Sequence, residues 1–342
     1  MIQPYQPPVS SDDIDLDLSR NEGRPVDPEL LARVAIADGT ANRYPDSTEL
    51  RSGIAELRRV SPERVLVTAG GDDALFRCCA ALISPGTRTV TTTPTFEMVA
   101  RYARLHQPDL VEAPWKGGAF PIDVMTGAAA PGSTCVVVSP NNPTGEVIDA
   151  SDMTSLSGAF EYVVLDGAYT EFADIDITGT ALSLPNVLMI RTLSKAWGLA
   201  GLRVGYLIGR AELVRQISAF GNPYPVSRFS LAVAVERIRS NHGVDSYVRE
   251  VKRERQLLAD FLRSRGFDPI PSQGNFVYFE APDPQPIVDR LADEGIAVRV
   301  FPDRPGLEDS IRITVPGNPD EYDRLAGALA SALDTTAMEL NK

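Results

Sequence analysis

Polar side chains that could do chemistry follow several apolar runs of this sequence. Asp166 closes the run EYVVLD, and Lys195 follows NVLMIRT after a Thr-Leu-Ser loop. Two further segments of this kind are residues 70–73 (GGDD) and 140–145 (PNNPTG). A lysine amine can attack an electrophilic carbon, a carboxylate can meet a cation, and glycines that open a helix present backbone N–H groups to phosphate. Together these segments call for a ligand with a phosphate, a cationic ring and an electrophilic carbon.

Each of these features also has an ordinary structural explanation. Residues 70–73 can form a tight turn with Asp72 as the N-cap of a helix, and Asp166 can cap the segment after it. An isolated lysine at the end of a strand can simply extend to solvent. Lys195 is favoured as a chemical group because three other strand ends carry matching groups. Neither a P-loop nor a GxGxxG spacing is present, which argues against a nucleoside triphosphate or a Rossmann dinucleotide.

Pyridoxal 5'-phosphate (PLP) has all three properties. Its aldehyde condenses with a lysine amine, its pyridinium pairs with a carboxylate, and its phosphate binds at a helix N-terminus. Candidates for the amine are few, because the 33 basic residues include only four lysines. Lys116 lies in a predicted loop, Lys252 in a charged helix and Lys342 at the terminus, so Lys195 is the candidate.

A scaffold has to bring these strand ends together. Up to about residue 220, short β-branched runs alternate with amphipathic helical stretches, which is typical of an α/β fold with a mainly parallel sheet flanked by helices. Ligands of such sheets bind where the carboxyl ends of the strands meet the following loops. The predicted strands cover residues 64–69, 88–93, 134–139, 161–166 and 186–192, with a further run at 204–209 that can return antiparallel.

The pattern changes after residue 220, where the Pro-rich segment GNPYPVS begins. Helices are predicted at about 227–240, 244–265 and 319–333, and the last of these follows three strand-like runs: NFVYFE, IAVRVF and SIRITV. We therefore predict a large domain at residues 35–235 and a smaller α+β domain at 236–342, with residues 1–34 packed against the smaller one. The prolines of that N-terminal segment predict that it forms no regular element of its own.

Composition excludes several classes of function. The chain has 342 residues, and 33 basic against 46 acidic residues give a net charge of -13, which argues against nucleic acid or an anionic membrane as partner. Two histidines and three cysteines without CxxC spacing predict no metal site. We find neither a secretory signal nor a membrane-spanning run, and therefore expect a cytoplasmic protein with reduced thiols.

The motifs resemble those of the fold-type I PLP-dependent aminotransferases, and within them the histidinol-phosphate aminotransferase branch. This resemblance implies a large domain with a seven-stranded, mainly parallel sheet and a smaller α+β domain. It covers most of the chain, and the most specific motif is RTLSKAWGLAGLRVGY at residues 191–206. The other motifs, in order, are PYQPP (4–8), SRNEG (19–23), RYPD (43–46), GGDDAL (70–75), PTFEM (94–98), SPNNPTG (139–145), VLDGAY (164–169), PYPVS (223–227), GIAVRV (295–300) and SIRITV (310–315).

The resemblance implies how these residues bind the cofactor. Lys195 would form the internal aldimine and then move the proton between Cα and the cofactor carbon. Asp166 would keep the pyridine nitrogen protonated, Asn142 and Tyr169 would bond the phenolic oxygen, and Phe96 would stack on the ring. The groups expected to bind the phosphate are the backbone N–H groups of Gly71 and Asp72, the hydroxyls of Thr192 and Ser194, and the guanidinium of Arg203.

The resemblance also implies a substrate pocket and a second subunit. Arg312 would bind an anionic group of the substrate and Arg299 would lie near it, although Arg299 could equally be a surface residue of its strand. A guanidinium suits phosphate and carboxylate alike. The other expected substrate contacts are Tyr5, Asn21 and Asn142. Tyr44 would reach the phosphate site of a partner, so a homodimer is expected.

The predicted function is a PLP-dependent aminotransferase that transfers the amino group of histidinol phosphate, or of a related imidazole or aromatic amine or amino acid, to 2-oxoglutarate. Two departures from the family leave the substrate open: Gly167 stands where the family has Glu, and Phe96 where this branch has Tyr. One alternative is a PLP decarboxylase, cyclase or oxidase of the same fold in specialised biosynthesis. Another is a non-catalytic relative, which the intact set of Lys, Asp, Asn and Tyr disfavours.

Overall fold

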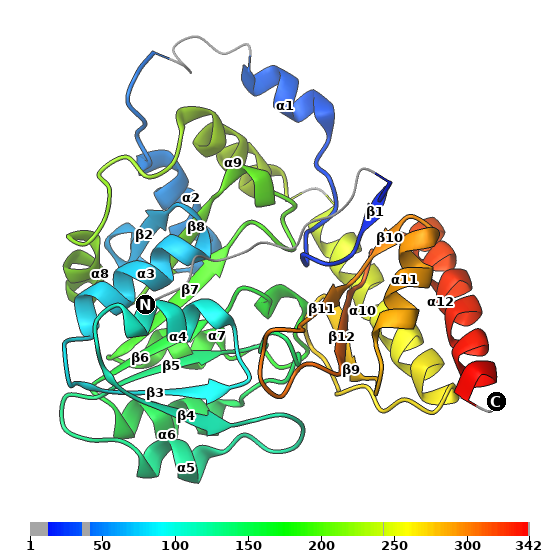
Figure 1. The fold of residues 1–342 in the computed structure, drawn as a ribbon. Helices are drawn as coiled ribbons and strands as arrows, with labels where there is room; N and C mark the ends of the chain where they lie inside the picture. Colours follow the sequence, from blue (N-terminus) through cyan, green and yellow to red (C-terminus); the bar gives the residue numbers. More distant parts are fainter. Residues whose placement is uncertain (1–12, 36–41, 242, 341–342) are drawn as a thin grey trace.

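Seven strands form the central sheet of the protein (Figure 1). The computed structural model describes residues 13–35, 42–241 and 243–340. The sheet order is β2-β8-β7-β6-β5-β3-β4, and β8 is the one strand that pairs antiparallel with both neighbours. The strands are β2 (Val65–Thr68), β3 (Arg88–Thr93), β4 (Asp109–Pro114), β5 (Thr134–Val138), β6 (Tyr162–Asp166), β7 (Val187–Thr192) and β8 (Gly205–Ile208). The prediction of a mainly parallel sheet with an antiparallel return at 204–209 is confirmed.

Helices cover both faces of this sheet, which explains why its strands are apolar throughout. Alternate residues of β5 serve opposite faces: Val136 and Val138 pack with α3, α4 and α8, whereas Cys135 and Val137 pack with α5, α6 and α7. The helices of this part are α2 (Thr48–Arg58), α3 (Gly70–Leu82), α4 (Glu97–Arg104), α5 (Ile122–Gly127), α6 (Ala150–Ala159), α7 (Thr178–Ser183), α8 (Ala211–Ser218) and α9 (Arg228–Ser240).

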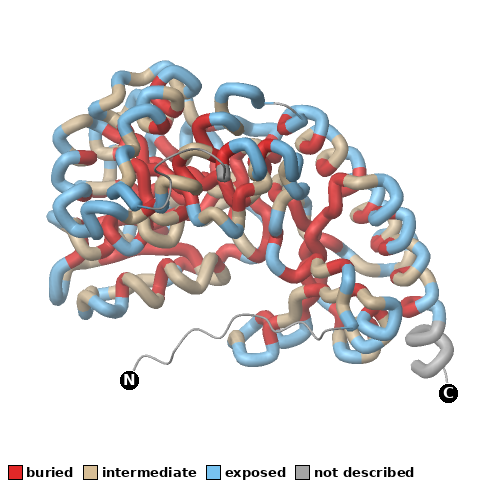
Figure 2. Tube along the Cα trace, turned by 90° about the horizontal axis from the view of Figure 1, so that it is seen from above, coloured by how far each residue is buried: buried red, intermediate tan, exposed pale blue. Residues whose placement is uncertain are grey.

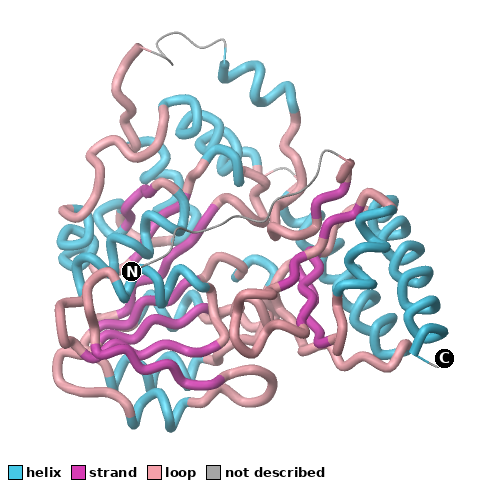
Figure 3. Tube along the Cα trace, viewed as in Figure 1, coloured by secondary structure: helices cyan, strands magenta, loops and turns pink. Residues whose placement is uncertain are grey.

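A second group of strands lies beside the large sheet (Figure 3). Its three-stranded sheet has the order β11-β12-β9 with antiparallel pairing, and helices α10, α11 and α12 complete this part of the chain. The elements are α10 (Val244–Ser264), β9 (Phe276–Glu280), α11 (Gln285–Asp293), β10 (Ile296–Ala297), β11 (Arg299–Val300), β12 (Ser310–Thr314) and α12 (Pro319–Leu340). The prediction of a single strand over IAVRVF is wrong. This segment forms two short strands separated at Val298, because β10 pairs with β1 while β11 pairs with β12.

The described residues of the N-terminal segment include two regular elements, so the prediction that it has none is wrong. β1 (Leu16–Asp17) pairs in parallel with β10, whose free edge supplies its hydrogen bonds. Helix α1 (Pro28–Ala35) begins at Pro28, where a missing N–H costs nothing because the first turn of a helix has no intrahelical acceptor for it. β1 and β10 form a separate two-stranded sheet, and the assignment of residues 1–34 to the smaller domain stays a prediction. Helix α1 lies beside α9.

Buried residues run continuously from the large sheet into the smaller part (Figure 2). One core cluster combines residues of β2, β8 and α9 with residues of α10, β9, β12 and α12. The domain boundary at residue 235 therefore crosses a shared core, and it stays a prediction. Among the described residues, no helix combines the length and the hydropathy needed to cross a membrane.

Candidate active site

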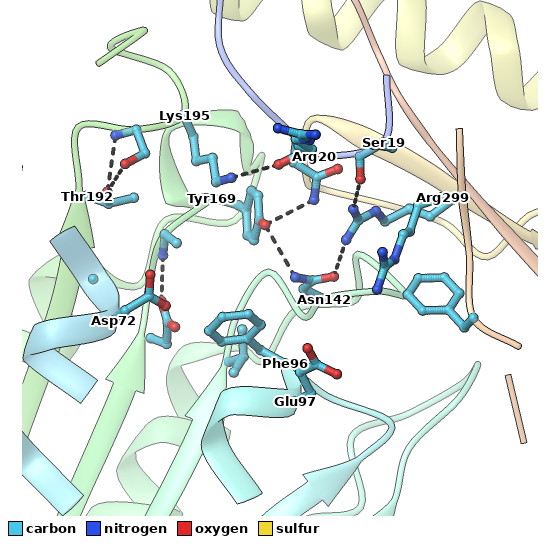
Figure 4. Close-up of a pocket in the computed structure, with 18 of the residues that line it drawn as sticks. Ser19, Arg20, Asp72, Phe96, Glu97, Asn142, Tyr169, Thr192, Lys195 and Arg299 are labelled. Carbon is cyan, nitrogen blue, oxygen red and sulfur yellow. Dashed lines mark hydrogen bonds between the residues drawn. The ribbon is translucent and has the colours of Figure 1, made fainter. Parts of the chain in front are cut away.

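A cavity of about 290 Å³ opens at the carboxyl ends of β5, β6 and β7, facing β11 and β12 (Figure 4). Most residues expected at the site line it, although they come from segments up to 291 residues apart. These residues are Asn21, Gly71, Asp72, Phe96, Asn142, Asp166, Tyr169, Thr192, Ser194, Lys195, Arg203, Arg299 and Arg312. Tyr5 lies outside the described residues, and Tyr44 lies on the surface and does not line this cavity.

Backbone N–H groups at the start of α3 line one end of the cavity. The helix begins at Gly70, its N-cap is Ala69, and no side chain caps it. Asp72 therefore does not act as the N-cap, and its carboxylate accepts a hydrogen bond from Arg203 at 3.0 Å. Gly70 has a φ of 78°, and a Cβ there would lie 2.7 Å from the Arg203 guanidinium, so glycine fits this close approach.

Two hydroxyl groups lie at the same end of the cavity. Thr192 donates to Ser194 at 2.9 Å, and the backbone N–H of Ser194 donates to the Thr192 hydroxyl at 3.1 Å. Strand β7 ends at Thr192, which places both hydroxyls at a strand end. Hydroxyls, a guanidinium and the N-terminus of a helix form together a site suited to a phosphate group.

The Asp166 carboxylate lies in the floor of the cavity at the end of β6. Burial raises the pKa of Asp166 to about 7, although the N–H of Ala168 and the nearby Lys195 and Arg191 cations act in the opposite direction. The Ala168 N–H donates to it at 3.0 Å. A buried carboxyl with so high a pKa is stabilised in its charged form when a cation binds beside it.

Lys195 extends into the cavity from the loop after β7. Its Nζ donates to the carbonyl oxygen of Arg20 at 3.1 Å and lies 5.7 Å from the centre of the Tyr169 ring. Desolvation and the neighbouring Arg312 cation lower the pKa of Lys195 to about 8. A larger fraction of this amine is therefore neutral near pH 7 than for a lysine in water, which makes it a better nucleophile.

A chain of hydrogen bonds connects the far side of the cavity to Tyr169. Arg312 donates through Nη1 to Asn142 Oδ1 at 2.6 Å and through Nη2 to the carbonyl of Ser19 at 2.6 Å. Asn142 Nδ2 in turn donates to the Tyr169 hydroxyl at 3.5 Å, and Asn21 Nδ2 donates to the same hydroxyl at 3.0 Å. Both amides thus direct N–H groups at one phenolic oxygen.

The N-terminal segment crosses the cavity in contact with these residues. Ser19 and Arg20 present their carbonyls to Arg312 and Lys195, and Asn21 contacts Tyr169. A Cβ at position 23 would lie 1.8 Å from the Lys195 carbonyl oxygen, so only glycine fits there. The expectation that Asn21 contacts the substrate stays a prediction, and its amide is already engaged by the protein.

Three guanidinium groups surround the ring of Phe301, and all four residues line the cavity. The ring centre lies 5.4 Å from the Cζ atom of Arg299, 5.8 Å from that of Arg304 and 5.9 Å from that of Arg312. Arg299 lines the cavity, so it is not merely a surface residue of β11. Glu97 is the carboxylate that lines the cavity beside this group. The excess positive charge favours an anion.

Sequence reasoning missed several residues that line the cavity: Ser19, Arg20, Glu97, Val138, Ala168, Phe301 and Arg304. Glu97 stands within the PTFEM motif, beside the expected aromatic residue, so the motif could have identified it. Arg304 lies in the loop between β11 and β12, where no motif marks it. Its Nη2 donates to the carbonyl of Thr95 at 2.8 Å and so connects this loop to the segment that carries Phe96.

A largely buried ion cluster supports the strand and loop that carry Lys195. Glu171 accepts from Arg191 at 2.5 Å, from Arg58 at 3.1 Å and from the Trp197 indole at 3.3 Å. Burial alone would raise the pKa of Glu171, but the two guanidinium groups outweigh it and hold the pKa below its usual value. Glu171 is therefore charged, and it fixes residues on both sides of Lys195.

Tyr44 lies on the surface, where 78% of it is exposed. Its ring stacks on Tyr224, with 4.6 Å between the centres and 20° between the planes. Within one chain it does not line the cavity, and its expected contact with a partner stays a prediction.

Comparison with known proteins identifies the family and the fold. The sequence matches the family described as aminotransferase class I and II over residues 14–329. The chain belongs to this family. It is 32% identical over 336 residues to histidinol-phosphate aminotransferase 1 of Nostoc sp., covering 96% of this chain and 94% of that protein. It is 34% identical to the histidinol-phosphate aminotransferase of Xanthomonas campestris pv. campestris, covering 92% and 90%.

The aminotransferase also resembles solved structures. Superposition on the crystal structure of histidinol-phosphate aminotransferase from Sinorhizobium meliloti in complex with PLP gives a TM-score of 0.83 at 26% identity, covering 94% of this chain and 92% of that one. The predicted fold-type I architecture is confirmed. PLP is the cofactor, as predicted, and the substrates are a small-molecule amino donor and an oxo-acid acceptor.

The cavity of the aminotransferase fits PLP in three independent respects. The start of α3 has no side-chain cap and is free to bind a phosphate. Asp166 is buried, and the nearby cations of the protein do not offset the effect of burial on its pKa, which stays raised. Lys195 has an amine that its surroundings keep partly neutral. These groups would hold the phosphate, the ring nitrogen and the aldehyde carbon respectively.

Proposed function

We propose that this aminotransferase transfers the amino group of histidinol phosphate to 2-oxoglutarate. The observation that carries the proposal is the group of Arg299, Arg304 and Arg312 around Phe301, in the same cavity as Asp166 and Lys195. Three cations against the Glu97 carboxylate leave an excess of about two positive charges, which matches a phosphate dianion better than a single carboxylate. The names of the similar proteins support the same substrate.

When bound, PLP supplies an electrophilic carbon for the donor amine and a ring that takes up electrons as a bond at Cα breaks. We propose that Lys195 holds the cofactor and then moves the proton at Cα. Asp166 keeps the ring nitrogen protonated, Tyr169 and Asn142 bond the phenolic oxygen, and Phe96 packs on the ring face. The phosphate is bound by Gly71, Asp72, Thr192, Ser194 and Arg203.

On the substrate side, Arg312 and Arg299 bind the anionic group, and Asn142 lies between Arg312 and the cofactor. Tyr5 and Asn21 belong to the N-terminal segment that we propose closes the pocket. The large guanidinium groups exclude water from one wall once an anion binds, which strengthens every electrostatic contact inside.

We further propose a homodimer, in which Tyr44 reaches the phosphate site of the partner subunit. The exposure of the stacked Tyr44 and Tyr224 rings supports this arrangement, because large aromatic surfaces are enriched at interfaces.

We propose two domains: a large domain at residues 35–235, and a small domain at residues 236–342 together with residues 1–34. The protein is proposed to be cytoplasmic, and its three buried free thiols suit a reducing compartment.

The PLP-loaded enzyme should convert histidinol phosphate in the absence of an acceptor. Bound PLP should become pyridoxamine phosphate in a one-to-one ratio, and 2-oxoglutarate should then restore PLP and yield glutamate. Unphosphorylated histidinol is the matched control, and it should need at least tenfold higher concentration for half-maximal conversion. Conversion of histidinol as efficiently as of its phosphate ester would contradict the proposed phosphate pocket.

An alternative outcome separates this proposal from the other PLP chemistries. Release of CO₂ from a phosphorylated amino acid, or oxygen consumption without pyridoxamine phosphate, would indicate a decarboxylase or an oxidase. Those reactions use the same lysine and carboxylate, and they differ in which bond at Cα is aligned with the ring.

A further inference from the structure

We propose that Asn21 and Thr314 are positioning residues that force the hydroxyl of Tyr169 to donate its proton into the cofactor cavity. The proposal rests on the proposed role of Tyr169 toward PLP. It concerns two residues that are not among the expected cofactor contacts: Asn21 belongs to the N-terminal segment, and Thr314 ends β12 on the small sheet.

Every polar atom of Asn21 has a partner in the protein. Its backbone N–H donates to the Thr314 hydroxyl at 3.0 Å, and the Thr314 hydroxyl donates to Asn21 Oδ1 at 3.0 Å. Its Nδ2 donates to the Tyr169 hydroxyl at 3.0 Å, and its carbonyl accepts from Asn275 Nδ2 at 3.3 Å. Asn21 is 1% exposed, so water cannot replace these partners.

Thr314 determines which end of the Asn21 amide faces Tyr169. Its buried hydroxyl accepts the backbone N–H of Asn21 and donates its single proton to Asn21 Oδ1. A flipped amide would turn its NH₂ group toward this hydroxyl and take away the acceptor of the Thr314 proton, which is costly in a buried site. The amide oxygen is thereby held at Thr314, and the NH₂ group is held at Tyr169. A flipped amide would present its oxygen to Tyr169 and would accept the phenolic proton.

The Asn142 amide is held in the same way, with its NH₂ group toward the Tyr169 hydroxyl. Its Oδ1 accepts from Arg312 at 2.6 Å, which leaves Nδ2 to face the Tyr169 hydroxyl at a longer 3.5 Å. A phenolic oxygen can accept two hydrogen bonds and donate one. Figure 4 shows the two hydrogen bonds that meet at the Tyr169 hydroxyl. Because both neighbouring amides donate, neither can accept the Tyr169 proton, which leaves the cavity as its direction.

The backbone conformation of Asn21 shows that the surrounding contacts hold this residue in place. Its φ is 56°, in the left-handed region that non-glycine residues rarely adopt. Such conformations persist where the surrounding contacts impose them, and they cluster at functional sites. Here the contacts with Thr314 and Asn275 impose it.

Deprotonation of bound PLP leaves a negative charge on its phenolic oxygen that no neighbouring proton of the cofactor then balances. A hydrogen-bond donor at this oxygen stabilises the deprotonated form. The Tyr169 proton should therefore lower the apparent pKa at which the visible absorption band of the resting PLP enzyme changes. Thr314→Val removes the hydroxyl, permits the Asn21 amide to flip, and should raise this apparent pKa by about one unit. Asn21→Asp, which places an acceptor at Tyr169, should raise it at least as much.

Two controls separate positioning from a general loss of structure. Thr314→Ser keeps the hydroxyl and should titrate like the wild type. In a Tyr169→Phe background, Thr314→Val should cause no further shift, because no phenolic proton remains to be directed. No substrate enters the measurement, so its result is independent of whether histidinol phosphate is the donor.

Other outcomes would overturn the proposal. An unchanged titration in both Thr314→Val and Asn21→Asp would show that Tyr169 is oriented without them. A Thr314→Val shift that persists in the Tyr169→Phe background would show that Thr314 acts on the cofactor by another route. If Thr314→Val does not fold, Asn21→Asp carries the test with the same background control.

Discussion

Replacing Asp166 by asparagine should stabilise the cofactor-free protein as the pH rises from 4 to 8. Burial raises the pKa of this carboxyl from 3.8 to about 7. Between those values the folded state keeps the proton that the unfolded state has lost, so the stability of the wild type falls as pH rises. The rise is roughly three units at 1.36 kcal/mol each, so the ionised carboxylate costs the folded protein about 4 kcal/mol above pH 7.

Asparagine has the shape of aspartate and cannot ionise. The Asp166→Asn variant should thus be indistinguishable from the wild type near pH 4, and its advantage should grow to about 4 kcal/mol by pH 8. Urea unfolding of the cofactor-free proteins at pH 5 and pH 8 measures this difference. Asp268→Asn, at an exposed carboxyl, is the control and should change stability little at either pH.

Adding PLP should reverse the order of stability at pH 8. The ionised Asp166 carboxylate can then pair with the protonated ring nitrogen, whereas asparagine cannot, so the wild type gains more from the cofactor. An Asp166→Asn variant that is no more stable than the wild type at pH 8 without cofactor would refute the reasoning. An advantage of the same size at both pH values would refute it equally.

Three further substitutions test the contacts around the cavity. Glu171→Gln leaves the buried Arg191 and the partly buried Arg58 without their anion and should cost about 3–5 kcal/mol of unfolding free energy in urea titrations. Gly23→Ala should lower kcat about tenfold or more, because its Cβ displaces the Lys195 backbone; Gly127→Ala, with open space around it, should leave kcat unchanged. Arg312→Lys loses paired donation to an anion, so the donor KM should rise about tenfold, and an unchanged KM would exclude direct binding.

Much of this fold follows from local sequence patterns. Fully apolar runs such as residues 134–138 mark strands that are covered on both faces, and the polar residue after each run marks the edge where ligands bind. Asp166 could be identified in this way because it closes such a run, and Lys195 because it lies in the loop directly after another. The neighbours that lower or raise their pKa values could not, since these depend on the packing of distant segments.

Contacts between distant segments explain what the sequence did not predict. Asn21 contacts Tyr169 across 148 positions and Thr314 across 293, and no spacing rule joins them. The strand IAVRVF divides because one half pairs with the N-terminal segment, which local propensity cannot indicate. Arg304 reaches the cavity from a loop, where neither periodicity nor a motif fixes its direction.

The central claim is that Lys195 is the amine that holds PLP. Lys116 is paired with Glu280 and Lys252 with Asp174, both away from the cavity. Borohydride reduction of the PLP-loaded enzyme, followed by peptide mapping, should place one pyridoxyl group per chain on Lys195, and Lys195→Ala should abolish the label. A label on Lys116, Lys252 or Lys342, or a label that persists in Lys195→Ala, would contradict the assignment.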